Sequence, residues 1–176
     1  MLATFLAGCE NNMSDVEALG KKEAGVEIGR QVSIYYYGAG GELKAHLTAP
    51  LLHRYAAQPP RVEMNEGLHV DFFNDSMQVE SILTAKTGVY NELTNDILLK
   101  DSVVVVNLKK GNRLESQELH WDAKKQEYYT NTPVKLTTAT STMSTPTGLV
   151  ANQDISYWEM NDTRGAFKMD STLAPQ

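Results

Sequence analysis

The stretch that decides the fold is Leu83-Thr84-Ala85-Lys86-Thr87-Gly88-Val89-Tyr90-Asn91. It returns 31 residues later as Leu114-Glu115-Ser116-Gln117-Glu118-Leu119-His120-Trp121-Asp122, with Tyr90 matched by Trp121. The same offset then relates Asp96 to Glu127 and leads into strands that end at residues 103–106 and 134–136. Each copy contains a strand, a tight turn after an aromatic residue and a returning strand, and one such hairpin cannot bury its apolar face alone. The repeat therefore predicts stacked hairpins whose sheet folds over on itself.

Apolar and polar residues alternate with a period of two beyond this repeat as well. Residues 43–49 and 68–73 alternate in this way, which is typical of half-buried strands. The β-branched residues 103–106 predict a strand that is buried more completely than its neighbours. Turn signals separate these runs at residues 38–41, 59–60, 74–76, 91–92, 110–112, 131–133 and 146–148. Since no long helical stripe interrupts them, the pattern predicts an all-β domain of short antiparallel strands.

The composition bounds the class of protein. A chain of 176 residues, 41% hydrophobic and 22% charged, is long enough to bury a core as one domain. Its 16 lysines and arginines against 22 aspartates and glutamates give a net charge of −6, which argues against a nucleic-acid partner. A single cysteine excludes both a disulfide framework and a CxxC metal or redox site.

That single cysteine, Cys9, follows a short apolar stretch that ends in Leu6-Ala7-Gly8. The order resembles the bacterial lipobox, in which cleavage before the cysteine exposes it for lipid attachment. It implies that residues 1–8 are the end of a signal peptide and that Cys9 carries a lipid. We interpret the polar residues 9–31 as the lipidated N-terminus and a flexible tether with a mean reach of about 26 Å. The alternative is a free cysteine near a chain end.

The repeat and its following strands resemble the LptC/OstA-like family of the lipopolysaccharide export system. The family pattern is L-x-A-x-x-(apolar)-x-Y followed by D-x-L-L-K-x-x-V-x-V, and residues 35–49 are similar to the family's opening stretch. The matching residues are Leu83, Ala85, Gly88, Tyr90, Asp96, Leu98, Leu99, Lys100, Val103 and Val105, then Leu114, Leu119, Trp121, Val134 and Leu136. The likeness covers residues 32–167 and implies a twisted open β-jellyroll, a V-shaped pair of antiparallel sheets. Residues 168–176 would then be a C-terminal tail.

The resemblance also implies a location and partners. Members of the family are held at the inner membrane of Gram-negative bacteria and face the periplasm. They receive lipopolysaccharide from an ATP-driven ABC transporter and pass it to a soluble, homologous bridge protein of the LptA type by continuing one sheet into the next. Familiar members carry a transmembrane helix where this chain has the lipobox, so we expect a lipid anchor with the same topology.

An apolar interior between two sheets can shelter acyl chains, since each CH₂ group that leaves water gains about 0.8 kcal/mol. The residues expected to line such a groove are Leu43, Leu47, Leu68, Val70, Phe72, Leu83, Leu119, Trp121, Val134 and Leu136. The same stripe would form the core of any β-sandwich, so lining and plain core stay alternatives.

The expected partner edges are the first and last strands of the domain, because unpaired strand edges invite strand addition. We assign the first edge to residues 32–37, with Val32, Ile34 and Tyr36. We assign the last edge to residues 155–167, with Ile155 and Tyr157.

No catalytic, metal or cofactor site is expected. The histidines His46, His53, His69 and His120 are scattered, and the sequence has no HExxH, GxSxG, P-loop or dinucleotide-binding motif. The segment Lys109-Lys110-Gly111-Asn112-Arg113 is interpreted as a charged hairpin tip rather than a phosphate site. Two other classes stay open: a carrier lipoprotein that binds acyl chains in an incomplete β-barrel covered by helices, and a structural β-sandwich without a groove.

Overall fold

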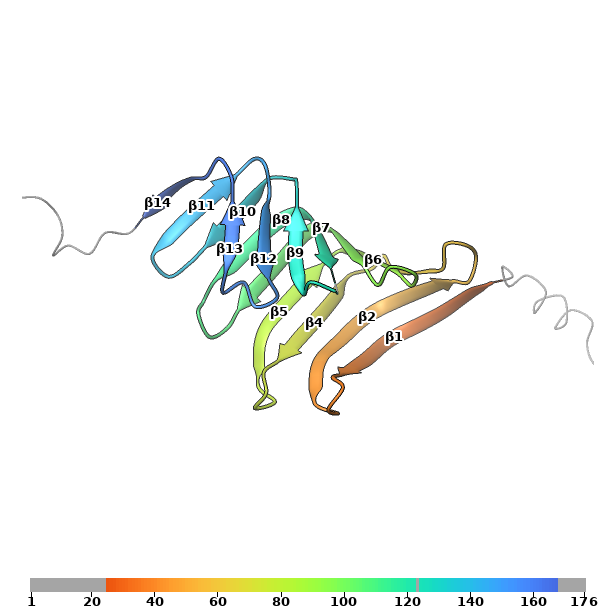
Figure 1. Ribbon diagram of the computed structural model, residues 1–176. Coiled ribbons are helices and arrows are strands. Elements are labelled where there is room, and N and C mark those ends of the chain that lie inside the picture. Colours follow the sequence, from red (N-terminus) through yellow and green to blue (C-terminus); the bar gives the residue numbers. More distant parts are fainter. Residues whose placement is uncertain (1–24, 123, 168–176) are drawn as a thin grey trace, which may run out of the picture.

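The computed structural model describes residues 25–122 and 124–167, and these form one antiparallel 14-stranded sheet. The strands are β1 (Val26–Tyr37), β2 (Leu43–Tyr55), β3 (Arg61–Met64), β4 (Leu68–Phe73), β5 (Val79–Ala85), β6 (Thr87–Asn91), β7 (Ile97–Asn107), β8 (Arg113–Asp122), β9 (Glu127–Thr130), β10 (Val134–Thr137), β11 (Ser141–Thr145), β12 (Leu149–Asn152), β13 (Trp158–Met160) and β14 (Arg164–Phe167). No helix occurs in these described ranges, and β1 and β14 lie at opposite ends of the molecule (Figure 1). The predicted all-β, jellyroll-like class is confirmed.

The long strands change neighbours part-way along their length, which divides the sheet into two layers. β7 pairs with β6 through residues 97–100 and with β5 through residues 104–107. β8 pairs with β9 through residues 120–122 and with β10 through residues 113–116. Layer A therefore contains β4, β5, β10, β11 and β14, layer B contains β3, β6, β9, β12 and β13, and β1, β2, β7 and β8 run through both.

The bends in these strands are local irregularities of the ladder. Asp101 and Ser102 have φ values of 61° and 55°, and both lie opposite Gln117, because Lys100 pairs with Glu118 while Val103 pairs with Ser116. Two residues facing one form a β-bulge, which bends a strand. In β1, Gln31 has a φ of 51° and lies opposite Pro50, which cannot donate a ladder hydrogen bond.

The two layers meet along one closed edge and are separate along the other. At the closed edge the Gly67 amide donates to the Lys86 carbonyl at 2.8 Å, and the Lys86 amide donates to the Asp101 carbonyl at 3.0 Å. The hairpin turns after β1, β4, β7 and β10 end layer A, and those after β2, β6, β8 and β12 end layer B. The sheet is thus folded like a V whose mouth lies between two rows of turns.

The 31-residue repeat is present in the structure. Asn91 Oδ1 accepts the amides of the next turn residues at 2.9 and 3.2 Å, and Asp122 Oδ1 does the same at 2.9 and 3.1 Å. Both turns close on a residue in the left-handed region, Asn95 in the first and Gln126 in the second. The conformation is the same because an Asx side chain holds each turn in place of a backbone group.

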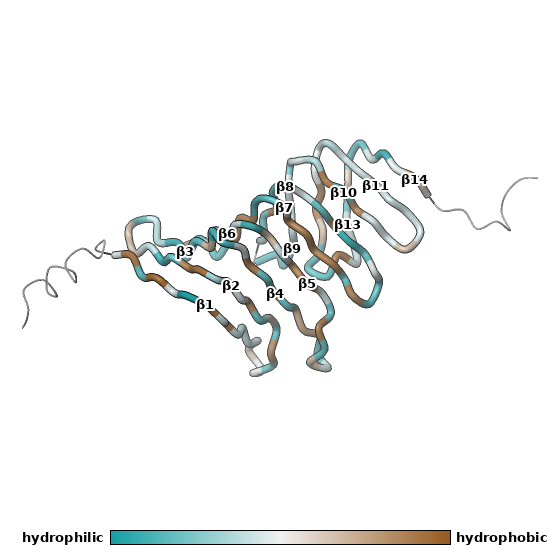
Figure 2. The backbone as a smooth tube through the Cα atoms, turned by 180° about the vertical axis from the view of Figure 1, so that it is seen from behind, coloured by the Kyte–Doolittle hydropathy of each residue, from teal (hydrophilic) through white to brown (hydrophobic). Residues whose placement is uncertain are grey.

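The core lies between the layers. Leu114, Leu119 and Leu136 have no exposed surface, which requires a layer on each side. Apolar and hydrophilic residues follow one another along β2, β4 and β5, so each strand has one apolar face (Figure 2). Within residues 103–106 only Val103 and Val105 are fully buried, so this run alternates like its neighbours.

Two expectations about the chain's organisation are wrong: the tether does not extend to residue 31, and residues 155–167 do not form one strand. Residues 26–31, assigned to the tether, form the first half of β1 and pair with β2 from Val26–Tyr55 to Arg30–Leu51. Their mixed composition, with the charged Glu27 and Arg30, fits an edge strand, which has a neighbour on one side and solvent on the other. Cys9, the lipobox and the rest of the tether fall on residues 1–24 and lie outside the described residues, as does the tail 168–176.

The region 155–167 is not one strand. It contains a turn, then β13 in layer B, then β14 in layer A. Ile155 lies in the turn and is fully buried, and the Tyr157 amide donates to Asn152 Oδ1 at 2.9 Å within the chain. Neither residue is an edge residue, because each is already used inside the domain.

Candidate acyl-chain groove

A continuous row of apolar side chains crosses layer A from β1 to β11. Each member of this row is the cross-strand partner of the next, so their side chains point to the same inner face. The row, which we call row A, consists of Ile34, Leu47, Val70, Leu83, Val105, Leu114, Leu136 and Met143. It runs perpendicular to the strands, from β1 to β11.

Layer B carries a matching row on its own inner face. Row B begins with the charged pair Glu27 and Arg54 and continues through apolar and aromatic residues. Its members in order are Glu27, Arg54, Val62, Tyr90, Ile97, Trp121, Tyr128, Ala151 and Trp158. The two rows therefore lie on the facing walls of the V along its whole length.

All ten residues expected to line a groove lie on the inner faces. Leu47, Val70, Leu83 and Leu136 belong to row A, and Trp121 belongs to row B. The others flank these rows: Leu43 and Phe72 toward the mouth, and Leu68, Leu119 and Val134 toward the closed edge. Whether they touch lipid is a separate question, which belongs to the proposal below.

Residues in the middle of this interior are more deeply buried than residues at its margins. Leu83, Leu119 and Leu136 are buried as core residues are. Ile34, Leu52, Phe72, Ile97, Trp121, Met143, Trp158 and Met160 are only partly buried and pack against that core. The centre is therefore packed, and the apolar surface that a ligand can reach lies at the ends and the mouth of the V.

A cluster of charged side chains lies at the β1 end of row B. The Arg54 guanidinium holds Glu92 with two hydrogen bonds, of 2.6 and 3.1 Å, and contacts Glu27 at 3.4 Å. The hydrogen bonds from Arg54 hold the pKa of Glu92 below its usual value. No sequence motif predicts this cluster, because its members are far apart in the chain.

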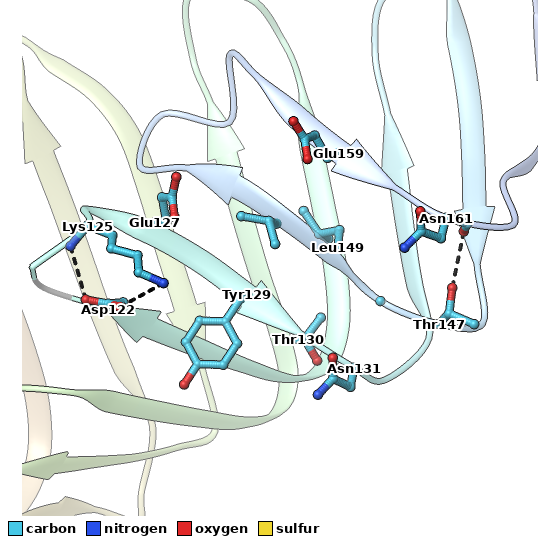
Figure 3. A pocket seen from close by; sticks show the side chains of 12 residues that line it. Asp122, Lys125, Glu127, Tyr129, Thr130, Asn131, Thr147, Leu149, Glu159 and Asn161 are labelled. Atoms are coloured by element: carbon cyan, nitrogen blue, oxygen red, sulfur yellow. Dashed lines mark hydrogen bonds and ion pairs between the residues drawn. The ribbon is translucent and has the colours of Figure 1, made fainter.

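Surface hollows also occur away from rows A and B. One, of about 430 Å³, lies on β9, β12 and β13 and is lined by exposed side chains such as Tyr129, Val150 and Glu159 (Figure 3). Because side chains alternate along a strand, these residues point away from Tyr128, Ala151 and Trp158 of row B. The hollow is thus a polar depression on the outer face and not the expected groove.

The histidines lie on the outer faces and take part in local contacts. His46 stacks on Tyr35 with 4.2 Å between ring centroids, His69 contacts Asp71 at 2.9 Å, and His120 contacts Glu118 at 3.2 Å. Among the described residues, no three His, Cys, Asp or Glu side chains gather as metal ligands would. The same residues contain no helix that is long and apolar enough to cross a membrane.

Comparison with known proteins agrees with this geometry. Residues 15–160 match the family model described as "Lipopolysaccharide-assembly, LptC-related", which is most of the chain. No curated protein matches the chain significantly. The matched family works in lipopolysaccharide transport in the periplasm, as a transport component rather than an enzyme. Because the family model covers residues 15–160, well over half of the sequence, the chain belongs to the LptC family of lipopolysaccharide-assembly proteins.

Proposed function

We propose that the protein is the membrane-anchored bridge component that receives lipopolysaccharide from the inner-membrane ABC transporter and passes it to a periplasmic, LptA-like jellyroll. The observation that carries this proposal is the pair of facing rows, which run from the β1 edge to the C-terminal strands. A lipid that moves along the mouth of the V keeps its acyl chains beside apolar inner faces, because rows A and B are continuous across the strands and only the β1 end of row B is charged.

The ends of the sheet support the transfer step. β1 pairs only with β2, β13 only with β12, and β14 only with β11, so each has one unpaired side within the described chain. A strand added there extends both the sheet and its inner rows. We assign the β1 edge to the transporter and the β13 and β14 edges to the bridge protein, with anchoring through Cys9. The backbone of Val32, Ile34 and Tyr36 then forms the first contact, while their side chains face the interior.

The alternative function, an acyl-chain carrier with an incomplete barrel, fits less well. A carrier needs an enclosed cavity, whereas two hollows of the described chain are open: one lies on the outer face of β9, β12 and β13, and the other lies at the bend of β1 and β2 beside β4. The transfer function needs open ends, and the unpaired strands supply them.

Site-specific photo-crosslinking in cells tests the assignment of the two ends. A photoreactive residue in place of Tyr35 in β1 should capture a transporter subunit, and one in place of Glu159 in β13 should capture the bridge protein. Glu115, on the outer face of β8 in the middle of the sheet, is the matched control and should capture neither. Capture of the same partner from both ends, or from Glu115 as efficiently as from either end, would show that strand addition does not determine the contacts.

A further inference from the structure

One turn of layer B crosses the mouth of the V and is tied to layer A. We call this turn, residues 153–157 between β12 and β13, the strap. Asn107 at the end of β7 donates from Nδ2 to the Asp154 carbonyl at 2.7 Å, and Asn112 before β8 donates from Nδ2 to the Ile155 carbonyl at 3.0 Å. Both asparagines are buried. The strap therefore closes the mouth at the β7–β8 turn, with β1 to β6 on one side and β10, β11 and β14 on the other.

Ile155 at the centre of the strap is held in an unfavourable conformation. Its φ is 45°, in the left-handed region, which is uncommon for a β-branched residue and persists only where the surroundings impose it. The side chain is fully buried and belongs to the core cluster between the layers. A branched aliphatic side chain thus enters the interior from the mouth, where the acyl chain of a passing lipid would enter.

The interior near the strap contains a polar atom without a partner. Tyr128, in row B, is 1% exposed, and its hydroxyl is buried with no hydrogen bond. A buried hydroxyl without a partner is costly, and native proteins retain such groups only rarely. Tyr128 is next to Trp121 and Ala151 in row B, on β9, whose neighbour β12 leads directly into the strap.

We propose that Ile155 occupies an acyl-chain subsite, that the strap is the gate of this subsite, and that the Tyr128 hydroxyl donates to a carbonyl or hydroxyl oxygen of the bound lipid. The inference rests on the proposed transfer function and adds to it a step at which the passage of lipid is controlled. Lipid enters freely on the β1 side, and it reaches the β10–β14 side only when the Asn107 and Asn112 hydrogen bonds open and Ile155 leaves. The subsite accepts acylated lipids with an oxygen acceptor close to the chain, as in an ester or amide.

Two half-buried apolar residues allow a test on either side of the strap. Phe72 lies on the β1 side and Met143 on the far side, and both face the interior. A photoreactive phenylalanine derivative is placed at one of them in the full-length, membrane-bound protein, which is then incubated with purified lipopolysaccharide. Asn112→Ala removes a strap hydrogen bond, and Asn131→Ala, at an exposed position on the β9–β10 connection, is the matched control.

We expect capture at Phe72 in every variant and weak capture at Met143 in the wild type. Asn112→Ala should raise capture at Met143 about fivefold to tenfold, because the loss of one hydrogen bond increases the fraction of molecules with an open strap by that factor. Asn131→Ala should leave capture at Met143 unchanged. Adding Tyr128→Phe to Asn112→Ala should reduce the capture at Met143 again. Equal capture at Phe72 and Met143 in the wild type, or no effect of Asn112→Ala, overturns the gate. Capture at neither position in any variant overturns the transfer function itself, and the gate with it.

Hydrogen exchange on the unsubstituted protein gives a measurement that does not depend on a variant folding. The amides of Ile155, Ser156 and Tyr157 are all bonded to Asn152 in the closed strap. Saturating lipopolysaccharide should speed their exchange several-fold while β4 becomes more protected. Unchanged or slower exchange in the strap, with β4 protected, contradicts the gate but leaves the transfer function intact.

Discussion

A comparison of Phe72 with Leu119 tests whether the inner face of the V contacts lipid. Phe72 is partly exposed near the mouth of layer A, whereas Leu119 is fully buried beside Leu99. Leu119→Ala should lower the free energy of unfolding by about 3–4 kcal/mol, because a buried leucine leaves a cavity. Phe72→Ala should lower it by only about 1–2 kcal/mol, because the ring still contacts water in the folded state.

Binding of lipopolysaccharide should reverse this order. If about 60 Å² of the Phe72 ring is covered by an acyl chain, its loss removes about 1.5 kcal/mol at 25 cal/mol per Å². Phe72→Ala should then weaken binding of purified lipopolysaccharide about tenfold, and Leu119→Ala, where it remains folded, should have little effect. Urea unfolding followed by circular dichroism and a fluorescence titration with the lipid measure the two quantities. If Phe72→Ala costs as much stability as Leu119→Ala and binding is unaffected, the interior is an ordinary core.

Three further predictions concern the fold. Gly148 has a φ of 88°, and a Cβ there would overlap the Thr130 carbonyl oxygen, so Gly148→Ala should destabilise the domain by about 3 kcal/mol or more in thermal unfolding. Tyr128→Phe removes the buried hydroxyl without a partner and should raise the free energy of unfolding by about 1 kcal/mol; a loss of stability would reveal an unseen partner. The pKa of Glu92 is lowered in the folded state, so its ion pair with Arg54 stabilises the fold above pH 4.5, the ordinary pKa, and this stabilisation is lost as the pH falls through the lowered value. The free energies of unfolding of the wild type and Glu92→Gln, measured by urea titration, should therefore differ at pH 7 and converge in acid. A difference that persists in acid contradicts the ion pair with Arg54.

The sequence by itself determined the strand content, the repeat and the inner faces. Alternation with a period of two places every second side chain on one face of a strand, so Leu47, Val70 and Leu83 could be assigned to the interior before their neighbours were known. The offset of 31 residues between Tyr90 and Trp121 predicted two equivalent hairpins, and both turns have the same conformation because an Asn or Asp side chain holds each of them at the same position.

Only the tertiary structure decided where the strands end and which edges stay free. Residues 26–31, which include the polar Glu27, Arg30 and Gln31, become a strand because β2 offers them a partner at the edge, which no local pattern reveals. The Arg54 cluster joins residues from β1, β2 and the turn after β6, and the strap joins the β12–β13 turn to two asparagines near the β7–β8 turn. The sequence predicts one terminal strand over residues 155–167, whereas the position of Ile155 in a closing turn depends on hydrogen bonds from Asn107 and Asn112, which lie more than 40 residues earlier in the chain.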